Sequence, residues 1–99
     1  MDRKMANKFA SAEIERLLQE QGITHLHIQG RGDHLVLYSL EDEEKTNRVR
    51  FTRLSVNKYQ ISIANHRGRW EKTPFIGTIP ELVNMLVEQF FLSWQNINC

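Results

Sequence analysis

The sequence has little cysteine and little proline. Its single cysteine is Cys99, at the last of the 99 positions, and it contains two prolines. One thiol cannot form an intramolecular disulfide or a cysteine-based zinc site. We therefore expect the packing of one hydrophobic core to hold the fold together. We also expect Cys99 to be an incidental exposed thiol rather than a nucleophile.

Long apolar runs are also missing. No stretch approaches the roughly 18 uninterrupted apolar residues that cross a bilayer. The first eight residues, MDRKMANK, lack the apolar segment of a secretory signal. We therefore expect no membrane contact and a cytoplasmic location. We expect residues 1–8 to form a flexible tail, followed by a single domain over residues 9–99.

Sequence signatures of catalysis are absent as well. There is no dinucleotide fingerprint and no nucleophile motif, and the glycine-rich run Gly30–Asp33 has no helix after it, as a phosphate loop would require. The composition, 40% hydrophobic and 25% charged, is that of an ordinary folded domain. These features favour a small non-catalytic binding or regulatory module without a cofactor over an enzyme.

Hydrophobic patterning predicts one helix followed by several strands. Apolar residues at helical spacing indicate a short amphipathic helix over Ser11–Gln21. Alternation of apolar and polar residues predicts four strands, at Thr24–Gln29, His34–Leu40, Arg48–Leu54 and Tyr59–Ala64. Trp70 begins a short fifth strand at the edge of the sheet, which Pro74 is expected to end.

A second helix is predicted to begin just after Thr78, because Thr78 and Glu81 have the spacing of a capping box. Its apolar residues cover more of the helix than one sheet face needs. The excess has two explanations, packing beneath the N-terminal segment or a homodimer contact through Phe90, Phe91 and Trp94. The predicted fold class is α+β, an antiparallel meander of four or five strands with both helices packed on one face.

Charge is divided sharply along the chain. Residues 45–72 hold eight Lys or Arg and one acid, a formal charge of +7, whereas the rest of the chain holds five against eleven, or −6. Such a division creates a local field that attracts an anionic partner even though the net charge is only +1. The compact acidic run Glu41–Glu44 is expected to be a solvated loop rather than a metal site.

The period of two then predicts which side chains face solvent. If Val49 and Phe51 face the helices, the neighbouring strand residues point to the open side of the sheet. That side would carry His25, His27, Arg48, Arg50, Thr52, Gln60 and Ser62, and it would be extended at one end by His66, Arg67, Arg69 and Lys72, with Trp70 in the same turn region. A solvated sheet face with no binding role, and a turn whose tryptophan closes the sheet edge, are the structural alternatives.

We predict that this basic face holds an acidic partner protein. The predicted contact residues are Arg48, Arg50, Arg67, Arg69, Trp70, His25 and His27. Nucleic acid on the same face is the alternative. An isoelectric point of about 8.0 and the lack of a central pair of aromatic residues count against it. The two histidines share a strand face but have no evident third or fourth ligand, so we expect no metal.

Overall fold

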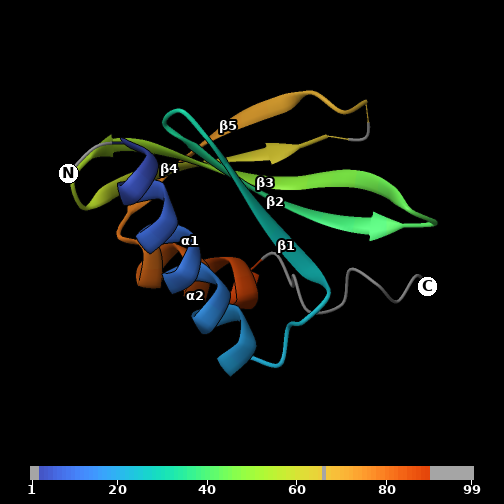
Figure 1. The fold of residues 1–99 in the computed structure, drawn as a ribbon. Helices are drawn as coiled ribbons and strands as arrows, with labels where there is room; N and C mark the ends of the chain where they lie inside the picture. The colour runs from blue at the N-terminus through green and yellow to red at the C-terminus, as the bar shows by residue number, and fades with distance from the viewer. Residues whose placement is uncertain (1–2, 66, 90–99) are drawn as a thin grey trace.

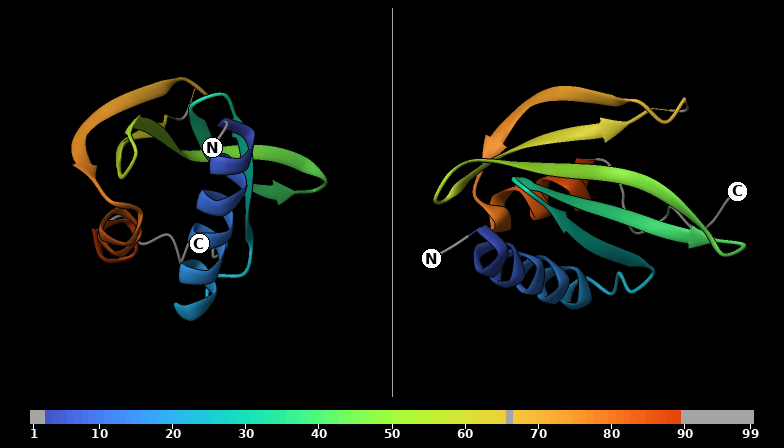
Figure 2. Two further views of the ribbon diagram at one scale, coloured as in Figure 1. Left: turned by 60° about the vertical axis from the view of Figure 1, so that its left-hand side comes forward. Right: turned by 45° about the horizontal axis from the view of Figure 1, so that its top comes forward.

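The computed structural model describes residues 3–65 and 67–89. Its elements follow the order α1 (Arg3–Glu20), β1 (Leu26–Arg31), β2 (His34–Glu41), β3 (Glu44–Ser55), β4 (Lys58–Ala64), β5 (Trp70–Gly77) and α2 (Ile79–Gln89). Each strand pairs antiparallel with the next, so the sheet is a five-stranded meander. Figures 1 and 2 show α1 and α2 on the same side of this sheet. The predicted α+β fold is confirmed.

The core lies between the sheet and the two helices. The sheet contributes alternate residues of its central strands, namely Leu35, Leu37, Val49, Phe51 and Ile61, and the helices contribute Ile14, Leu18, Leu82 and Leu86. A spacing of two in strands and of four in helices places each set on one face of its element. Val49 and Phe51 therefore face the helices, as the alternation predicted.

Helix α1 is longer than the sequence pattern indicated. It begins at Arg3, so residues 3–8 are helical instead of forming part of a tail. The side chain of Asn7 donates a hydrogen bond to the Gly32 carbonyl at 2.8 Å and accepts one from Arg53 at 3.0 Å. These bonds attach the first turns of α1 to the β1–β2 turn and to the end of β3. The spacing of apolar residues in the sequence does not predict these hydrogen bonds of Asn7.

Strand β5 also extends further than expected, because Pro74 does not end it. The register of β5 against β4 shifts between the pairs Ser62–Lys72 and Gln60–Ile76, so Pro74 lies in an irregular stretch of an edge strand. Proline is tolerated at such a place because no ladder hydrogen bond needs its missing N–H.

The β2–β3 hairpin closes through a tight turn. Glu41 pairs with Glu44, which leaves Asp42 and Glu43 as the two central residues, with φ of 53° and 68°. Two-residue hairpin turns with positive φ at both positions favour Asn-Gly or Asp-Gly. The second position of this turn therefore holds a residue with an unfavourable backbone conformation.

Replacing Glu43 by glycine should stabilise the fold. Relief of left-handed strain, about 1–2 kcal/mol, outweighs the entropic cost of glycine, about 0.5–1 kcal/mol, so the free energy of unfolding should rise by about 0.5 kcal/mol. Urea denaturation measures this change. Glu44→Gly is the matched control, because Glu44 lies in a strand and its replacement should lower stability. A lower midpoint for Glu43→Gly than for the unchanged chain would contradict this explanation.

The start of α2 is capped as predicted. The Thr78 N–H donates to Glu81 Oε1 at 2.9 Å, and the Glu81 N–H donates to Thr78 Oγ1 at 3.4 Å. The first of these bonds is the main reason that the pKa of Glu81 lies below its usual value. Gly77 permits this approach, since a Cβ built there would lie 2.8 Å from Glu81 Oε1. Phe90, Phe91 and Trp94, suggested for a dimer contact, lie outside the described residues.

Thr78→Ala should lower the free energy of unfolding by about 1 kcal/mol, the usual cost of losing an N-cap side chain. Thr78→Ser keeps the hydroxyl and should remain close to the unchanged chain. Urea midpoints of the three proteins, measured at neutral pH, test this expectation. Equal midpoints for the alanine and serine variants would show that the cap contributes nothing.

Candidate functional site

The sheet face opposite the helices carries a shallow groove of about 350 Å³. Four strands line it, through Gln29, Arg31, His34, Val36, Lys45, Asn47, Arg50 and Trp70. We call this set the open-face groove. Val36 and Arg50 each lie between two buried neighbours in their strands, so the pleat directs them away from the core. The lining includes three Lys or Arg and no Asp or Glu.

The strand register assembles the groove from distant parts of the sequence. Arg31 of β1 pairs with His34 of β2, and Val36 pairs with Arg50 of β3. Trp70 pairs with Ala64 near the end of β4. Residues up to 41 positions apart in the chain therefore meet on one face, as Gln29 and Trp70 do.

Arg50 and Trp70 form the most direct contact in the groove. The guanidinium carbon of Arg50 lies 4.9 Å from the centre of the Trp70 ring, within the range of a cation–π interaction. Arg50 Nε is buried and has no hydrogen-bond partner among the described residues. Within the described part of the chain, neither Arg31 nor Arg50 makes an ion pair or a hydrogen bond through its side chain. Both retain donors for a carboxylate or phosphate.

A second cation lies over the other open-face aromatic residue. Lys45 Nζ lies 4.5 Å from the centre of the Tyr38 ring and donates a hydrogen bond to Gln29 Oε1. The imidazole of His27 approaches the same tyrosine, with ring centres 5.4 Å apart. Tyr38 thus supports a lysine and contacts a histidine.

Arg48 does not join Arg50 on this face. The pairing of β2 with β3 shifts between Leu37 and Tyr38, which makes Arg48 the extra residue of a β-bulge. Its Nε donates to the buried Ser39 Oγ at 3.1 Å, and its terminal nitrogen pairs with Glu41. The bulge therefore turns Arg48 toward Ser39, on the helix side of the sheet.

The other predicted contact residues do not line the groove. His25 lies just before β1 and is half-buried, and His27 is exposed on β1. Arg67 and Arg69 are exposed in the β4–β5 turn, where Asn65 Oδ1 accepts hydrogen bonds from both of their backbone N–H groups, at 2.9 and 3.0 Å. Of the seven predicted contact residues, Arg50 and Trp70 line the groove.

Six lining residues lie outside the predicted set, namely Gln29, Arg31, His34, Val36, Lys45 and Asn47. Arg31 lies within the predicted turn Gly30–Asp33, and His34 begins the next predicted strand. In the structure β1 continues to Arg31, which pairs with His34. Lys45 and Asn47 precede the point at which β3 was expected to begin. The basic block does begin at Lys45, and that was the available signal.

The surroundings of His34 in the groove shift its pKa. Burial is the main cause that lowers its pKa from 6.5, and the nearby Arg50 charge lowers it further, while Asp33 opposes both. His34 Nδ1 also shares a hydrogen bond of 3.0 Å with Thr52 Oγ1. Burial and the Arg50 charge therefore both favour the neutral form of His34.

An NMR titration should give His34 a midpoint below 6.5. As pH falls through 6.5, the unfolded chain takes up a proton before the folded chain does, so the free energy of unfolding should decrease there and be unaffected at higher pH. Arg50→Gln should raise the midpoint, because one unfavourable charge is removed, whereas Arg16→Gln on α1 should not. A midpoint at or above 6.5 in the unchanged chain would contradict this account of the groove.

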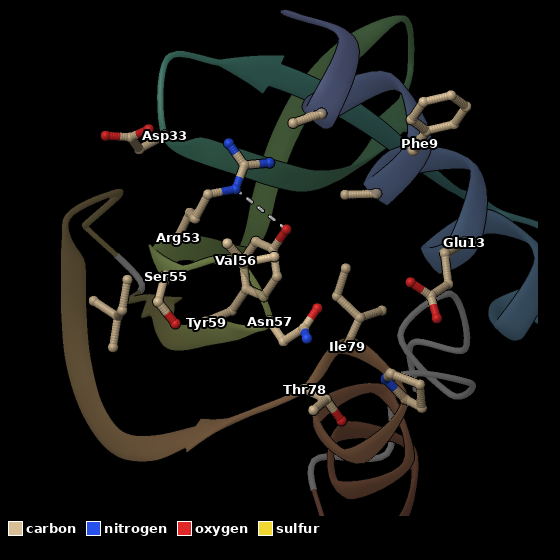
Figure 3. Close-up of a pocket in the computed structure, with 14 residues that line it drawn as sticks. Phe9, Glu13, Asp33, Arg53, Ser55, Val56, Asn57, Tyr59, Thr78 and Ile79 are labelled. Carbon is tan, nitrogen blue, oxygen red and sulfur yellow. Dashed lines mark hydrogen bonds between the residues drawn. The ribbon is translucent and has the colours of Figure 1, made fainter. Parts of the chain in front are cut away.

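A larger hollow, of about 840 Å³, lies elsewhere on the molecule, between α1, the β3–β4 turn and the start of α2 (Figure 3). Its rim includes three exposed apolar side chains, Phe9, Leu54 and Val56. Arg53 lines it but donates to Tyr59 Oη at 3.4 Å and to Asn7. The lining of the hollow therefore combines one hydrogen-bonded arginine with Glu13 and Asp33, and it lacks the excess of cations that the open-face groove has.

Neither a metal site nor a membrane span is found in the part of the chain that the structure describes. No three His, Cys, Asp or Glu side chains cluster there as metal ligands do. No helix there has the length and apolar character needed to cross a bilayer. Comparisons with family models, curated proteins and solved structures find no match to this chain. The geometry of the site therefore carries the functional argument.

Proposed function

We propose that the chain is a small non-catalytic binding module whose open-face groove holds an acidic segment of a partner protein. The observation that carries this proposal is the pair Arg31 and Arg50, unpaired among the described residues, in a groove without a carboxylate. An arginine can bind a carboxylate through two parallel hydrogen bonds. Two such residues beside Lys45 offer an acidic segment several charged contacts at once.

The arrangement of the aromatic rings favours carboxylates over nucleic-acid bases. Tyr38 and Trp70 lie on the same basic face, which is the observation in favour of nucleic acid as a second candidate. However, Lys45 covers one face of Tyr38 and Arg50 covers one face of Trp70. A base that stacks there must use the remaining face or displace a cation. A carboxylate needs neither ring.

Arg50→Gln should weaken the binding of a fluorescein-labelled oligoglutamate peptide by about tenfold or more. A hydrogen bond to a charged group contributes about 1.5–3 kcal/mol, and about 1.4 kcal/mol corresponds to a factor of ten. Arg48→Gln should have a smaller effect, because that side chain is already engaged by Ser39 and Glu41. Fluorescence anisotropy measures both affinities, with melting temperatures as a check on folding.

Arg16→Gln is the control for a lost surface charge, because Arg16 lies on α1, where it pairs with Glu20. The proposal fails if Arg50→Gln binds as tightly as the unchanged chain, or if Arg48→Gln weakens binding equally. Labelled single-stranded oligonucleotides are measured in parallel. Tighter binding of these probes than of the peptide, with a steep loss as salt is added, would favour the nucleic-acid alternative.

A further inference from the structure

The acidic and basic parts of the β2–β3 hairpin lie at different places along it. The four residues at its closed end, Glu41–Glu44, are all acidic and exposed, and we call them the acidic tip. Figures 1 and 2 show this end of the hairpin extending past both helices. The open-face groove begins at Lys45, next to the tip, and continues along the same two strands to Val36 and Arg50. Each molecule thus presents a projecting negative arm and a positive groove.

We propose that the groove binds the acidic tip of a second copy of this chain. This inference rests on the proposed function, and it names the acidic segment that the groove holds. The charges of the tip and of the groove are opposite in sign and equal in number. Glu41 is paired with Arg48, which leaves Asp42, Glu43 and Glu44 to face the three groove cations of the other copy, Arg31, Lys45 and Arg50.

A two-fold axis satisfies both contacts at once. Glu41 and Val36 are five positions apart on β2, a separation of roughly 17 Å at about 3.3 Å per residue. If the axis runs between two stacked sheets, parallel to both and perpendicular to the strands, and passes midway between tip and groove, two open faces pack about 10 Å apart with antiparallel hairpins. Each tip then lies over the other groove, which is the self-complementary contact of a closed dimer.

The tip cannot serve its own groove. Its strands are joined by a turn of two residues, and their pairing continues from Glu41–Glu44 to Leu37–Val49 with one bulge. A paired hairpin of this length does not fold back on itself. The cross-strand pair Glu41–Glu44 also places like charges opposite each other, which is unfavourable within one molecule. Cations from a second copy would offset that repulsion.

Charge reversal on each side of the contact gives a direct test with the full chain. The tip variant is Glu43→Lys with Glu44→Lys, and the groove variant is Arg31→Glu with Arg50→Glu. We expect the unchanged chain to form dimers at low salt and to dissociate near 1 M salt, where the screening length falls to about 3 Å. Each variant alone should be monomeric in sedimentation equilibrium. An equimolar mixture should regain the dimer, because reversed tips then meet reversed grooves.

Two further variants control for net charge and folding. Glu15→Lys with Glu88→Lys changes the net charge by the same amount as the tip variant, but at exposed positions on the helices. It should leave the dimer intact. If the tip variant fails to melt cooperatively, Glu43→Gln with Glu44→Gln removes the charges without reversing them, and it should raise the dimer dissociation constant at least tenfold.

The outcomes separate this inference from the proposed function. A chain that stays monomeric at low salt, yet binds oligoglutamate through Arg50, overturns the second-copy assignment and leaves acidic-partner binding in place. A dimer that persists in both variants uses another surface and also overturns it. Loss of both self-association and peptide binding in the groove variant, with rescue of the dimer on mixing, supports both.

Discussion

The burial of Val49 and Phe51 determines where the functional side chains lie. These residues are 2% and 0% exposed, and Phe51 meets the Tyr59 ring edge-on with centres 6.4 Å apart. Because side chains alternate along a strand, Arg50 between them must point to the open face. A slip of one residue would bring the arginine into the core and the two apolar side chains into water. The packing of Val49 and Phe51 in the core therefore determines where the groove lies.

Local patterns predicted the parts of the fold that depend on neighbours in sequence. The alternation around Phe51 and the Thr78–Glu81 capping box each follow from residues a few positions apart. The bulge at Arg48 could not be predicted in this way, because it depends on how β3 pairs with β2 beyond the pair Leu37–Val49, where Asn47 rather than Arg48 lies opposite Tyr38. The spacing of apolar residues predicted which side chains of β3 face the core. It did not predict that the inward–outward alternation is interrupted at Arg48.

The groove itself was only partly predictable for the same reason. Arg50 and Trp70 were named from the phase of one strand and the composition of one turn. Their meeting with Arg31 and Lys45 depends on the register of several strands in succession. The charge block indicated that cations would gather, and it located them only to within a segment. The same block included Arg48, which the fold pairs with Glu41, so a count of charges overestimated the basic character of the face.

The irregular edge strand β5 affects whether a strand from another molecule can add to the sheet. Pro74 offers no amide hydrogen, and the irregular pairing around it interrupts the outer row of donors and acceptors that an incoming strand would need. An edge of this sort is a poor template for continuous cross-β growth. The sheet is thus protected on this side from indefinite polymerisation into fibrils.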